Sequence, residues 1–493
     1  MDSLGLAKRF SPLSQFRSES DSNYAFLPFR FHRLVDQRVV LTNEVGEFTV
    51  LSPSDFELFS EHRLEQKNPA YDALKSRHFL LDSDSSVAID LLSLKARTKY
   101  QYVKQFTALH IFVVSLRCDY SCPYCQVSRQ TTEMGRFDMS EETARAAIDF
   151  TFRSPSPAIK IEFQGGEPLL NLPLIRFIVT NAKKRNEIEK RDLQFVIATN
   201  LSYLDSDVLA FCQENDIFLS TSLDGPEDLH NKNRPRPGQN GHALTVKAIE
   251  TVRAELGRER ISALMTTTEA SLGRVRDIID EYLVRGFRNI FLRSLSPYGF
   301  AIKTKNFDKY GTARWLDFYR EGLAYILDLN KQGIPFREEY AALILTQMLT
   351  PYSHRFVDLQ SPAGLGISAV VFNYDGDVYA SDEARMLAEM GDKTFRLGTL
   401  NRDSYEEIIG NDVLLRAIEE SITDSVPMCR DCAFKPYCGS DPVYHHATQG
   451  DWVGHKAKSG FCQKNMGIFQ HLIELLESGD EDTRKILEGW ART

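Results

Sequence analysis

The sequence predicts an α/β protein built around a partial barrel of six strand–helix units, (β/α)6, between a small N-terminal domain and a cysteine-rich C-terminal domain. Three observations predict this organisation. Apolar stretches alternate with amphipathic ones between residues 108 and 294. Short strand and helix patterns precede that region, between residues 24 and 100. Seven of the eight cysteines form two groups, one after the first barrel strand and one near the C-terminus.

The composition limits the classes of function. Of 493 residues, 42% are hydrophobic and 26% charged, so the chain can bury sizeable cores and is not a disordered protein. The net charge of −9 argues against nucleic acid as a partner, because that function needs a basic face. No apolar stretch reaches the ~18–20 residues of a membrane span, and residues 1–22 lack the apolar core of a signal peptide. We therefore expect a cytoplasmic protein with no membrane association, whose reduced cysteines bind metal rather than form disulfides.

The N-terminal domain is expected at residues 24–100, after a mobile N-terminus at residues 1–23. A polar turn with glycine separates two strand patterns, and the Ser52-Pro-Ser-Asp sequence is typical of a helix start. Strands followed by short helices are typical of a winged-helix-like domain; a purely structural cap is the alternative. The predicted strands are 29–34, 38–42 and 47–51, with a further apolar segment at 79–81, and the helices begin at 52, 69 and 86.

The barrel is expected at residues 101–310. Apolar strands separated by amphipathic helices indicate parallel strands with right-handed crossovers. Polar motifs follow the strand ends, where barrel enzymes place their chemistry. The predicted strands are 108–116, 158–164, 193–199, 216–223, 260–267 and 288–294, and the predicted helices are 140–153, 171–188, 204–215, 242–256 and 271–286.

The remainder of the chain is predicted as a helical linker at residues 311–360 and a C-terminal domain at residues 361–493. Apolar residues at helical spacing from Trp315 to Leu327 indicate a core-facing helix face. Residues 370–379 predict a hairpin with Asp375-Gly376 as its turn, and residues 464–478 predict a final helix.

The first cysteine group has the spacing C-x3-C-x2-C, at Cys118, Cys122 and Cys125. Three thiolates on one short loop can hold three irons of a [4Fe–4S] cube and leave the fourth iron open to an outside ligand. Zinc is the alternative, although a zinc site would need a fourth Cys or His in range.

This motif resembles that of the radical S-adenosylmethionine (SAM) superfamily, and the resemblance covers residues 108–470. Gln164-Gly-Gly-Glu-Pro168 resembles the family's glycine-rich motif for the amino group of the cofactor, and Ala198-Thr-Asn200 its third-strand motif, with Leu201 in place of a glycine. The resemblance implies that Ser222 contacts the ribose; for Asp224 and Arg234 a structural role in the loop is the alternative. The implied SAM contacts are Tyr124, Gln164, Gly165, Gly166, Glu167, Asn200, Ser222, Asp224 and Arg234.

The second cysteine group, Cys429, Cys432, Cys438 and Cys462, resembles the tail of SPASM-domain maturases, which usually carry two auxiliary clusters. Cysteines expected near Pro442, Ser381 and residues 361–366 are absent. The resemblance therefore implies one auxiliary [4Fe–4S] cluster, with structural zinc as the alternative. Cys212 is expected to be a small buried residue, and His445 and His446 are expected either to bind metal or to pack.

Asp382 is the candidate catalytic residue, because a proton-accepting Asp occupies the corresponding place in sulfatase-maturing relatives. The alternatives are Asp375, Asp377 and Glu383.

The N-terminal domain resembles a RiPP recognition element, which binds leader peptides by strand addition. Together with residues 27–31 and 373–386, the chain is similar to the B component of the His-Xaa-Ser system radical SAM maturases. That similarity implies hydrogen abstraction from a ribosomally made precursor peptide, an electron donor such as flavodoxin or ferredoxin, and a second radical SAM maturase as partner. The alternatives are maturation of a folded protein, as in sulfatases, and a winged-helix iron–sulfur regulator.

Overall fold

The computed structural model describes residues 23–133, 135–303, 307, 310–353 and 356–491. Of the N-terminus predicted to be mobile, residues 1–22 lie outside the described residues. The chain divides into two compact units, Met1–Lys95 and Ala96–Thr493. No helix in the described part of the chain is long and apolar enough to cross a membrane.

The first unit contains a three-stranded antiparallel sheet in the order β2–β3–β4 and a separate antiparallel pair, β1 with β5. Ser52 and Asn68 cap the first two helices through their side chains, as the sequence predicts for Ser52. The predicted strands and helices are confirmed, whereas β1 was not expected. The elements are β1 (Tyr24–Phe26), β2 (Phe29–Arg33), β3 (Val39–Asn43), β4 (Phe48–Leu51), α1 (Pro53–Ser60), α2 (Pro69–Ser76), β5 (Leu80–Asp82) and α3 (Ala88–Tyr100), which continues into the second unit.

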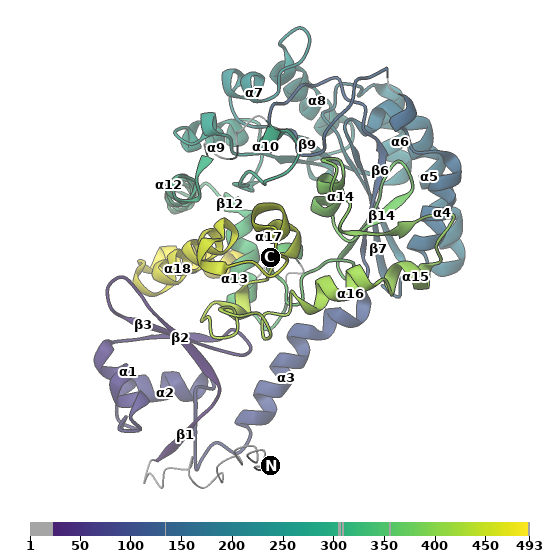
Figure 1. Cartoon of the computed structure of the whole chain (residues 1–493). Helices are drawn as coiled ribbons and strands as arrows, with labels where there is room; N and C mark the ends of the chain where they lie inside the picture. Colours follow the sequence, from purple (N-terminus) through teal and green to yellow (C-terminus); the bar gives the residue numbers. More distant parts are fainter. Residues whose placement is uncertain (1–22, 134, 304–306, 308–309, 354–355, 492–493) are drawn as a thin grey trace, which may run out of the picture. The chain divides into compact units, whose positions relative to one another are not determined.

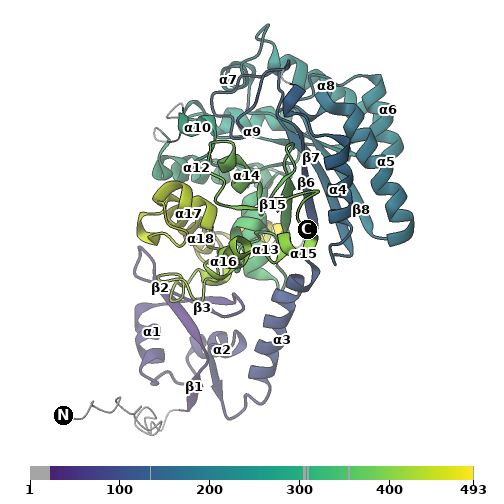
Figure 2. The ribbon, with the colours of Figure 1, turned by 45° about the vertical axis from the view of Figure 1, so that its right-hand side comes forward.

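The second unit is built on parallel strands joined by helices. Five of the six predicted barrel strands lie side by side in one sheet, in sequence order. Helices α4, α5 and α6 cover its outer face (Figures 1 and 2). The strands are β6 (Leu109–Ser115), β7 (Ala158–Gly165), β8 (Asp192–Ala198), β9 (Phe218–Ser222) and β10 (Ile261–Leu264), and the helices are α4 (Glu141–Thr151), α5 (Leu172–Glu189), α6 (Ser206–Asn215), α7 (Glu227–Asn233), α8 (Gly241–Glu255) and α9 (Val275–Val284).

The sixth strand differs from the prediction. Only β11 (Asn289–Ile290) is extended, and it pairs in parallel with β12 (Arg337–Glu338) instead of with β10. Glu338 is fully buried, and its carboxylate accepts hydrogen bonds from the backbone N–H groups of Leu292 (3.1 Å) and Ala341 (2.6 Å). A side chain therefore takes the hydrogen bond that a neighbouring strand would otherwise supply.

The predicted hairpin is confirmed and belongs to the barrel's own sheet. β13 (Ala369–Phe372) pairs in parallel with β6, and β14 (Asp377–Tyr379) and β15 (Arg396–Thr399) follow in antiparallel order. Gly376 has a φ of 87°, which explains the glycine at the turn. The sheet order is β10-β9-β8-β7-β6-β13-β14-β15, so the C-terminal region extends the sheet that carries the first cysteine loop.

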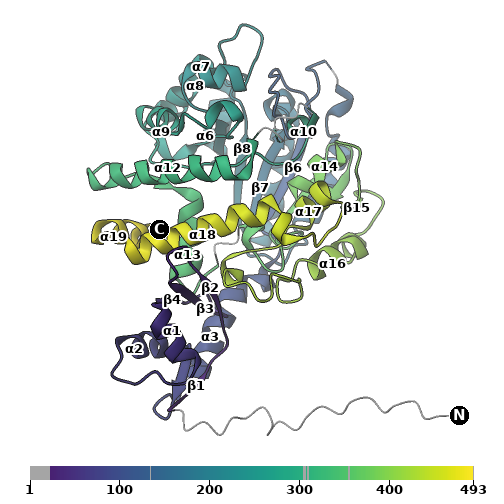
Figure 3. The ribbon, with the colours of Figure 1, turned by 60° about the vertical axis from the view of Figure 1, so that its left-hand side comes forward.

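Helices complete the unit. The apolar face predicted from Trp315 to Leu327 is buried on α12, which packs against α18; the two helices run side by side in Figure 3. The final helix is longer than predicted, and α19 follows it. These helices are α10 (Phe300–Lys303), α12 (Thr312–Lys331), α13 (Glu339–Leu349), α14 (Asp382–Ala388), α15 (Tyr405–Ile409), α16 (Asp412–Glu419), α17 (Pro442–Gln449), α18 (Gly460–Ser478) and α19 (Glu481–Trp490), with short 3-10 helices η2 (Gln101–Gln105), η3 (Gly135–Phe137), η4 (Pro168–Asn171), η5 (Arg258–Arg260), η6 (Glu269–Ser271), η7 (Val357–Leu359), η8 (Lys435–Tyr437) and η9 (Lys456–Lys458).

Candidate functional site

A cavity of about 530 Å³ lies at the carboxyl ends of the parallel strands and is closed by the C-terminal region. It brings together most of the residues predicted to form the site. Glu167, Asp224 and the four tail cysteines do not line it. Those that do are Cys118, Cys122, Tyr124, Cys125, Gln164, Gly165, Gly166, Asn200, Ser222, Arg234 and Asp382.

Backbone hydrogen bonds hold the first cysteine loop in place. The N–H of Cys118 donates to the carbonyl of Gln130 (3.0 Å), and the carbonyl of Cys125 accepts from the N–H of Phe300 (2.7 Å). The N–H of Tyr120 points at the Cys118 sulfur, 3.4 Å away. Burial raises the pKa of Cys122 to about 12 and that of Cys118 well above its usual value. Without a metal both thiols are therefore neutral.

The two glycines after β7 allow two strand ends to approach closely. A Cβ on Gly165 would lie 1.8 Å from the carbonyl oxygen of Ser115, and one on Gly166 would lie 2.4 Å from that of Arg117. In place of side chains, backbone hydrogen bonds link Gly166 to Ser115 (2.8 Å) and Glu167 to Arg117 (2.7 Å). The glycine motif therefore sets the position of the cysteine loop, which begins one residue after Arg117.

The carboxylate of Glu167 accepts three hydrogen bonds from other residues of the protein. It is fully buried and accepts from the Thr199 hydroxyl (2.7 Å) and from the backbone N–H groups of Asn200 (2.7 Å) and Leu169 (3.0 Å). Burial raises the pKa of Glu167 to about 7. Glu167 thus ties the end of β7 to the end of β8, and its Oε2, which accepts only from Asn200, keeps a lone pair for a further donor.

Asp224 is the centre of a buried network. Its carboxylate accepts from the hydroxyl of Tyr124 (2.6 Å) and from Nε of Arg234 (3.2 Å), while its other oxygen accepts from the N–H of Thr266 (3.3 Å). The Arg234 guanidinium lies 5.5 Å from the centre of the Tyr124 ring. Asp224 therefore does not line the cavity itself but positions Tyr124 and Arg234, which do.

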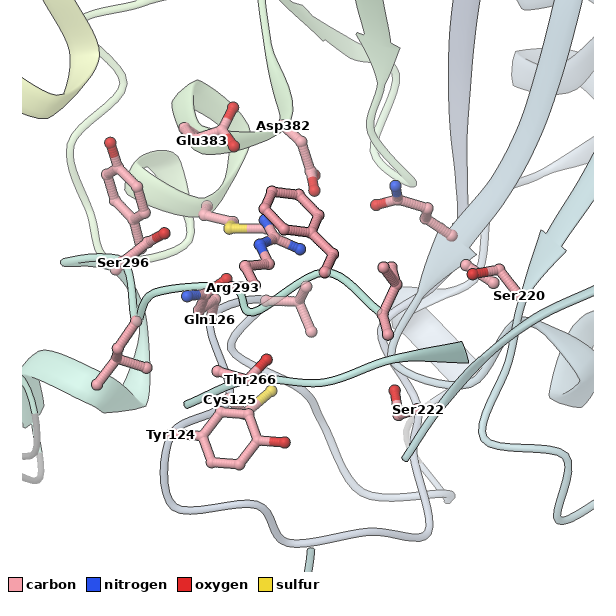
Figure 4. A pocket seen from close by; sticks show the side chains of 18 of the residues that line it. Tyr124, Cys125, Gln126, Ser220, Ser222, Thr266, Arg293, Ser296, Asp382 and Glu383 are labelled. Carbon is pink, nitrogen blue, oxygen red and sulfur yellow. The ribbon is translucent and has the colours of Figure 1, made fainter. Parts of the chain in front are cut away.

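Carboxyl groups from the C-terminal region form the opposite wall. Figure 4 shows Asp382 and Glu383 on one side of the cavity, Tyr124 and Cys125 on the other, and Arg293 between them. Asp382 is anchored by Arg385, whose guanidinium donates to it at 2.6 Å. Asp375 and Asp377, the alternatives in the hairpin, are not among the residues that line the cavity, and Asp377 is bound to Lys393 (2.7 Å).

The tail cysteines come together in a second place, outside the cavity. Cys438 follows η8 and Cys462 lies in the first turn of α18. Burial raises the pKa of Cys438, and the other three tail thiols raise it further, because they lie close enough to repel its charge. The four segments therefore converge.

The two histidines next to this group are packing residues. His445 is fully buried, with its ring nitrogens 2.6 Å from the Asp441 carbonyl and 2.9 Å from the Ser459 hydroxyl. His446 Nε2 lies 2.8 Å from Asp392. Cys212 is buried on α6, as expected.

Three thiols on one loop can hold three irons of a [4Fe–4S] cluster, and four thiols can hold such a cluster or a single zinc ion. Three thiols of one loop line a single cavity beside the glycine pair, and four thiols gather in the tail. Among the described residues, no three His, Cys, Asp or Glu side chains are placed to hold one metal ion.

Several cavity residues were not predicted from the sequence. They are Arg293, Tyr298, Asp358, Asp441 and Lys464, together with Trp315, which was assigned only to the core. They come from separate loops and helices, and none belongs to a recognisable motif.

Comparison with known proteins identifies the central region. Residues 112–280 match the Radical SAM superfamily model. These residues are therefore a radical SAM domain.

Two relatives illustrate the similarity in sequence. An uncharacterized protein of Methanocaldococcus jannaschii is 29% identical over 189 residues, which cover 38% of this chain and 62% of that protein. This chain therefore spans less than two thirds of that relative. A cysteine-type anaerobic sulfatase-maturating enzyme of Clostridium novyi is 21% identical over 384 residues, covering 73% of this chain and 96% of the enzyme.

Two solved structures share the fold. The enzyme anSMEcpe with bound AdoMet and the Cp18Cys peptide has a TM-score of 0.60 at 18% identity, covering 76% of this chain and 99% of that one. SuiB of Streptococcus suis, bound to its precursor peptide SuiA, has a TM-score of 0.51 at 12% identity, covering 89% of this chain and all of that one.

Proposed function

We propose that this enzyme modifies a ribosomally made precursor peptide, of the His-Xaa-Ser repeat type that the sequence resemblance implies. One observation carries the proposal. The first cysteine loop lies on one side of the cavity, and the carboxyl groups of Asp382 and Glu383, here called the acidic wall, lie on the other. A substrate held by this wall would therefore lie next to the cofactor site.

The residues that would hold the cofactors follow from the site. Cys118, Cys122 and Cys125 would hold a [4Fe–4S] cluster, and Ser222 and Arg234 line the cavity where SAM would bind. When bound, cluster and SAM supply a 5′-deoxyadenosyl radical that abstracts a hydrogen atom from the substrate. The four tail cysteines would hold one auxiliary [4Fe–4S] cluster.

The chain's own residues position and enclose the reacting groups. Glu167 and the glycine pair fix the strand ends under the cysteine loop, and the Asp224 network fixes Tyr124 and Arg234. On the opposite wall, Asp382 would accept a proton from the substrate. The Arg385 guanidinium holds this carboxylate in one orientation.

The N-terminal unit would capture the leader of the precursor. Its small antiparallel sheet is suited to strand addition, and α3 and the residue before it expose apolar side chains at Val87 (55%), Ile89 (61%) and Leu91 (43%). The second unit, residues 96–493, makes up 81% of the chain. The SuiB match covers 89% of the chain, so it extends into the N-terminal unit.

The second candidate is maturation of a folded protein. It is favoured by the similarity to the sulfatase-maturating enzyme of Clostridium novyi, because the match covers 96% of that enzyme. The partners we propose for either function are an electron donor, such as flavodoxin or ferredoxin, and for the peptide substrate a second radical SAM maturase.

The test is co-expression with a short His- and Ser-rich precursor encoded nearby, followed by mass spectrometry of that peptide. We expect a mass change with the wild type and with Cys212→Ala, because Cys212 lies away from both thiol groups. We expect none when Cys118, Cys122 and Cys125 are all replaced by alanine. An unmodified precursor together with SAM cleavage in the wild type would favour the folded-protein substrate. Wild-type amounts of 5′-deoxyadenosine from the triple variant would refute the radical mechanism itself.

A further inference from the structure

The acidic wall of the cavity is assembled from four elements. Asp358 lies on η7, Glu383 on α14, Asp441 caps α17 and Lys464 lies on α18, and all four line the cavity. The carboxylate of Asp441 already accepts from the N–H groups of Val443 (2.9 Å) and Tyr444 (3.0 Å) at one of its oxygens. The cluster is therefore fixed to the fold at several points.

The charges on this wall are out of balance around Glu383. Burial raises the pKa of Glu383, and Asp358, Asp382 and Asp441 raise it further. Lys464 acts on both Asp358 and Asp441, Arg293 acts on Asp358, and Arg385 pairs with Asp382. The largest influences on the pKa of Glu383 include no cation, and its pKa of about 8 keeps the group protonated at neutral pH until a cation binds beside it.

Two buried polar groups that line the same cavity have no partner within the described residues. Tyr298 and Trp315 are each only 1% exposed, and both line the cavity. Neither the Tyr298 hydroxyl nor the Trp315 Nε1–H makes a hydrogen bond within the described structure. Tyr298 lies near enough to Asp441, Glu383 and Asp358 for their charges to raise its pKa. A buried polar group without a partner costs free energy, so a bound ligand is the expected partner.

Among the described residues, no three carboxylates or other ligand side chains are placed to hold one ion. An organic cation suits this wall, because its N–H groups can donate to the carboxyl and hydroxyl oxygens.

We propose that Glu383, Asp441 and Tyr298 form a subsite for a protonated nitrogen base of the substrate peptide: an ammonium, a guanidinium or an imidazolium. Its N–H groups donate to Glu383 and to the Tyr298 oxygen, and the indole N–H of Trp315 donates to a carbonyl of the same peptide. The proposal deepens the proposed function, since it rests on a peptide substrate.

A second cavity gives the rest of the peptide a path. It has a volume of about 350 Å³ and shares six lining residues with the first, among them Trp315, Phe461 and Lys464. A peptide that places its basic side chain on the acidic wall can thus continue past Trp315 into this second space.

The test uses a charged probe and its neutral isostere, Nα-acetyl-arginine amide and Nα-acetyl-citrulline amide. Binding to the anaerobic holoprotein is followed through the 15N-indole signal of Trp315, one of three tryptophans, assigned with Trp315→Phe. We expect the arginine probe to bind at least ~10-fold more tightly than the citrulline probe, as for hydrogen bonds to a charged group. Glu383→Gln should abolish that preference, and Glu187→Gln, an exposed site on α5, should retain it.

Equal affinities of the two probes for the wild type would overturn the proposal, as would an unchanged preference in Glu383→Gln. A second variant covers the case in which Glu383→Gln does not fold. Tyr298→Phe should weaken the arginine probe without lowering the melting temperature, because the hydroxyl has no partner to lose. A lowered melting temperature would contradict the inference. Probe binding needs no turnover, so these outcomes are independent of whether the precursor is modified.

Discussion

Replacing Glu167 by glutamine tests the anchoring role of its carboxylate. Three donors converge on this side chain, two of them on one oxygen and the third, the Asn200 N–H, on the other. Glutamine offers one acceptor oxygen, and its NH2 group must face a donor on the other side. Leaving a buried N–H without an acceptor costs about 1–3 kcal/mol, so the variant is destabilised by that amount when the wild-type residue is protonated.

The stability difference between wild type and Glu167→Gln should depend on pH, because Glu167 titrates. The pKa of Glu167 is raised from 4.5 to about 7, which corresponds to about 3 kcal/mol. A raised carboxyl pKa means that the stabilisation is complete below pH 4.5 and is lost as the pH rises through 7. Glutamine does not titrate. The free-energy difference between wild type and Glu167→Gln should therefore shift by about 2.5 kcal/mol in favour of the variant between pH 5 and pH 8.

The assay is urea unfolding of both proteins at pH 5 and pH 8 under anaerobic conditions. Glu187→Gln, an exposed substitution on α5, serves as the control and should differ from the wild type equally at both pH values. A difference between wild type and Glu167→Gln that does not change with pH would show that Glu167 does not titrate as a buried carboxyl, and the anchoring argument would fail.

Three further results are expected. Reconstituted protein should contain ~8 irons per chain, falling to ~4 when the three barrel cysteines are replaced; iron analysis giving ~4 irons and one zinc in the wild type would identify a zinc tail. Gly165→Ala should lower stability by about 2–5 kcal/mol through its contact with Ser115, whereas Gly273→Ala, with open space around it, should not; equal unfolding midpoints for the two variants would contradict the close approach. Ile89→Asp should weaken precursor binding in an anisotropy assay. The control is Ile188→Asp, which changes another exposed isoleucine on α5 and should leave binding unchanged. Equal losses of affinity in the two variants would show that α3 does not bind the leader.

Secondary-structure elements that depend on a few neighbouring residues are predicted well from the sequence. The five barrel strands, the helix start at Ser52 and the hairpin turn at Asp375-Gly376 each follow from a few neighbouring residues. The residues that the family resemblance places on the strand ends come together in one cavity, because parallel strands bring their carboxyl ends together.

Features that depend on distant contacts were not predictable. The sixth strand is short because the buried carboxylate of Glu338, more than forty residues later, takes a backbone hydrogen bond. The acidic wall draws on residues as far apart as Arg293 and Lys464, whose packing leaves no local pattern. Glu167 was expected at the cofactor, but its burial and its three donors are visible only in the folded chain.

The pairing of β13 with β6 has a consequence for how the protein must be made. Ala369 pairs with Leu109, which is 260 residues earlier in the chain. A ribosome adds about 5–20 residues per second, so this edge of β6 waits roughly 10–50 s for its partner. During that time an apolar strand next to the thiol loop is open to pairing with other chains. We therefore expect chains truncated before residue 369 to aggregate, and high-level expression to benefit from slow growth and added chaperones.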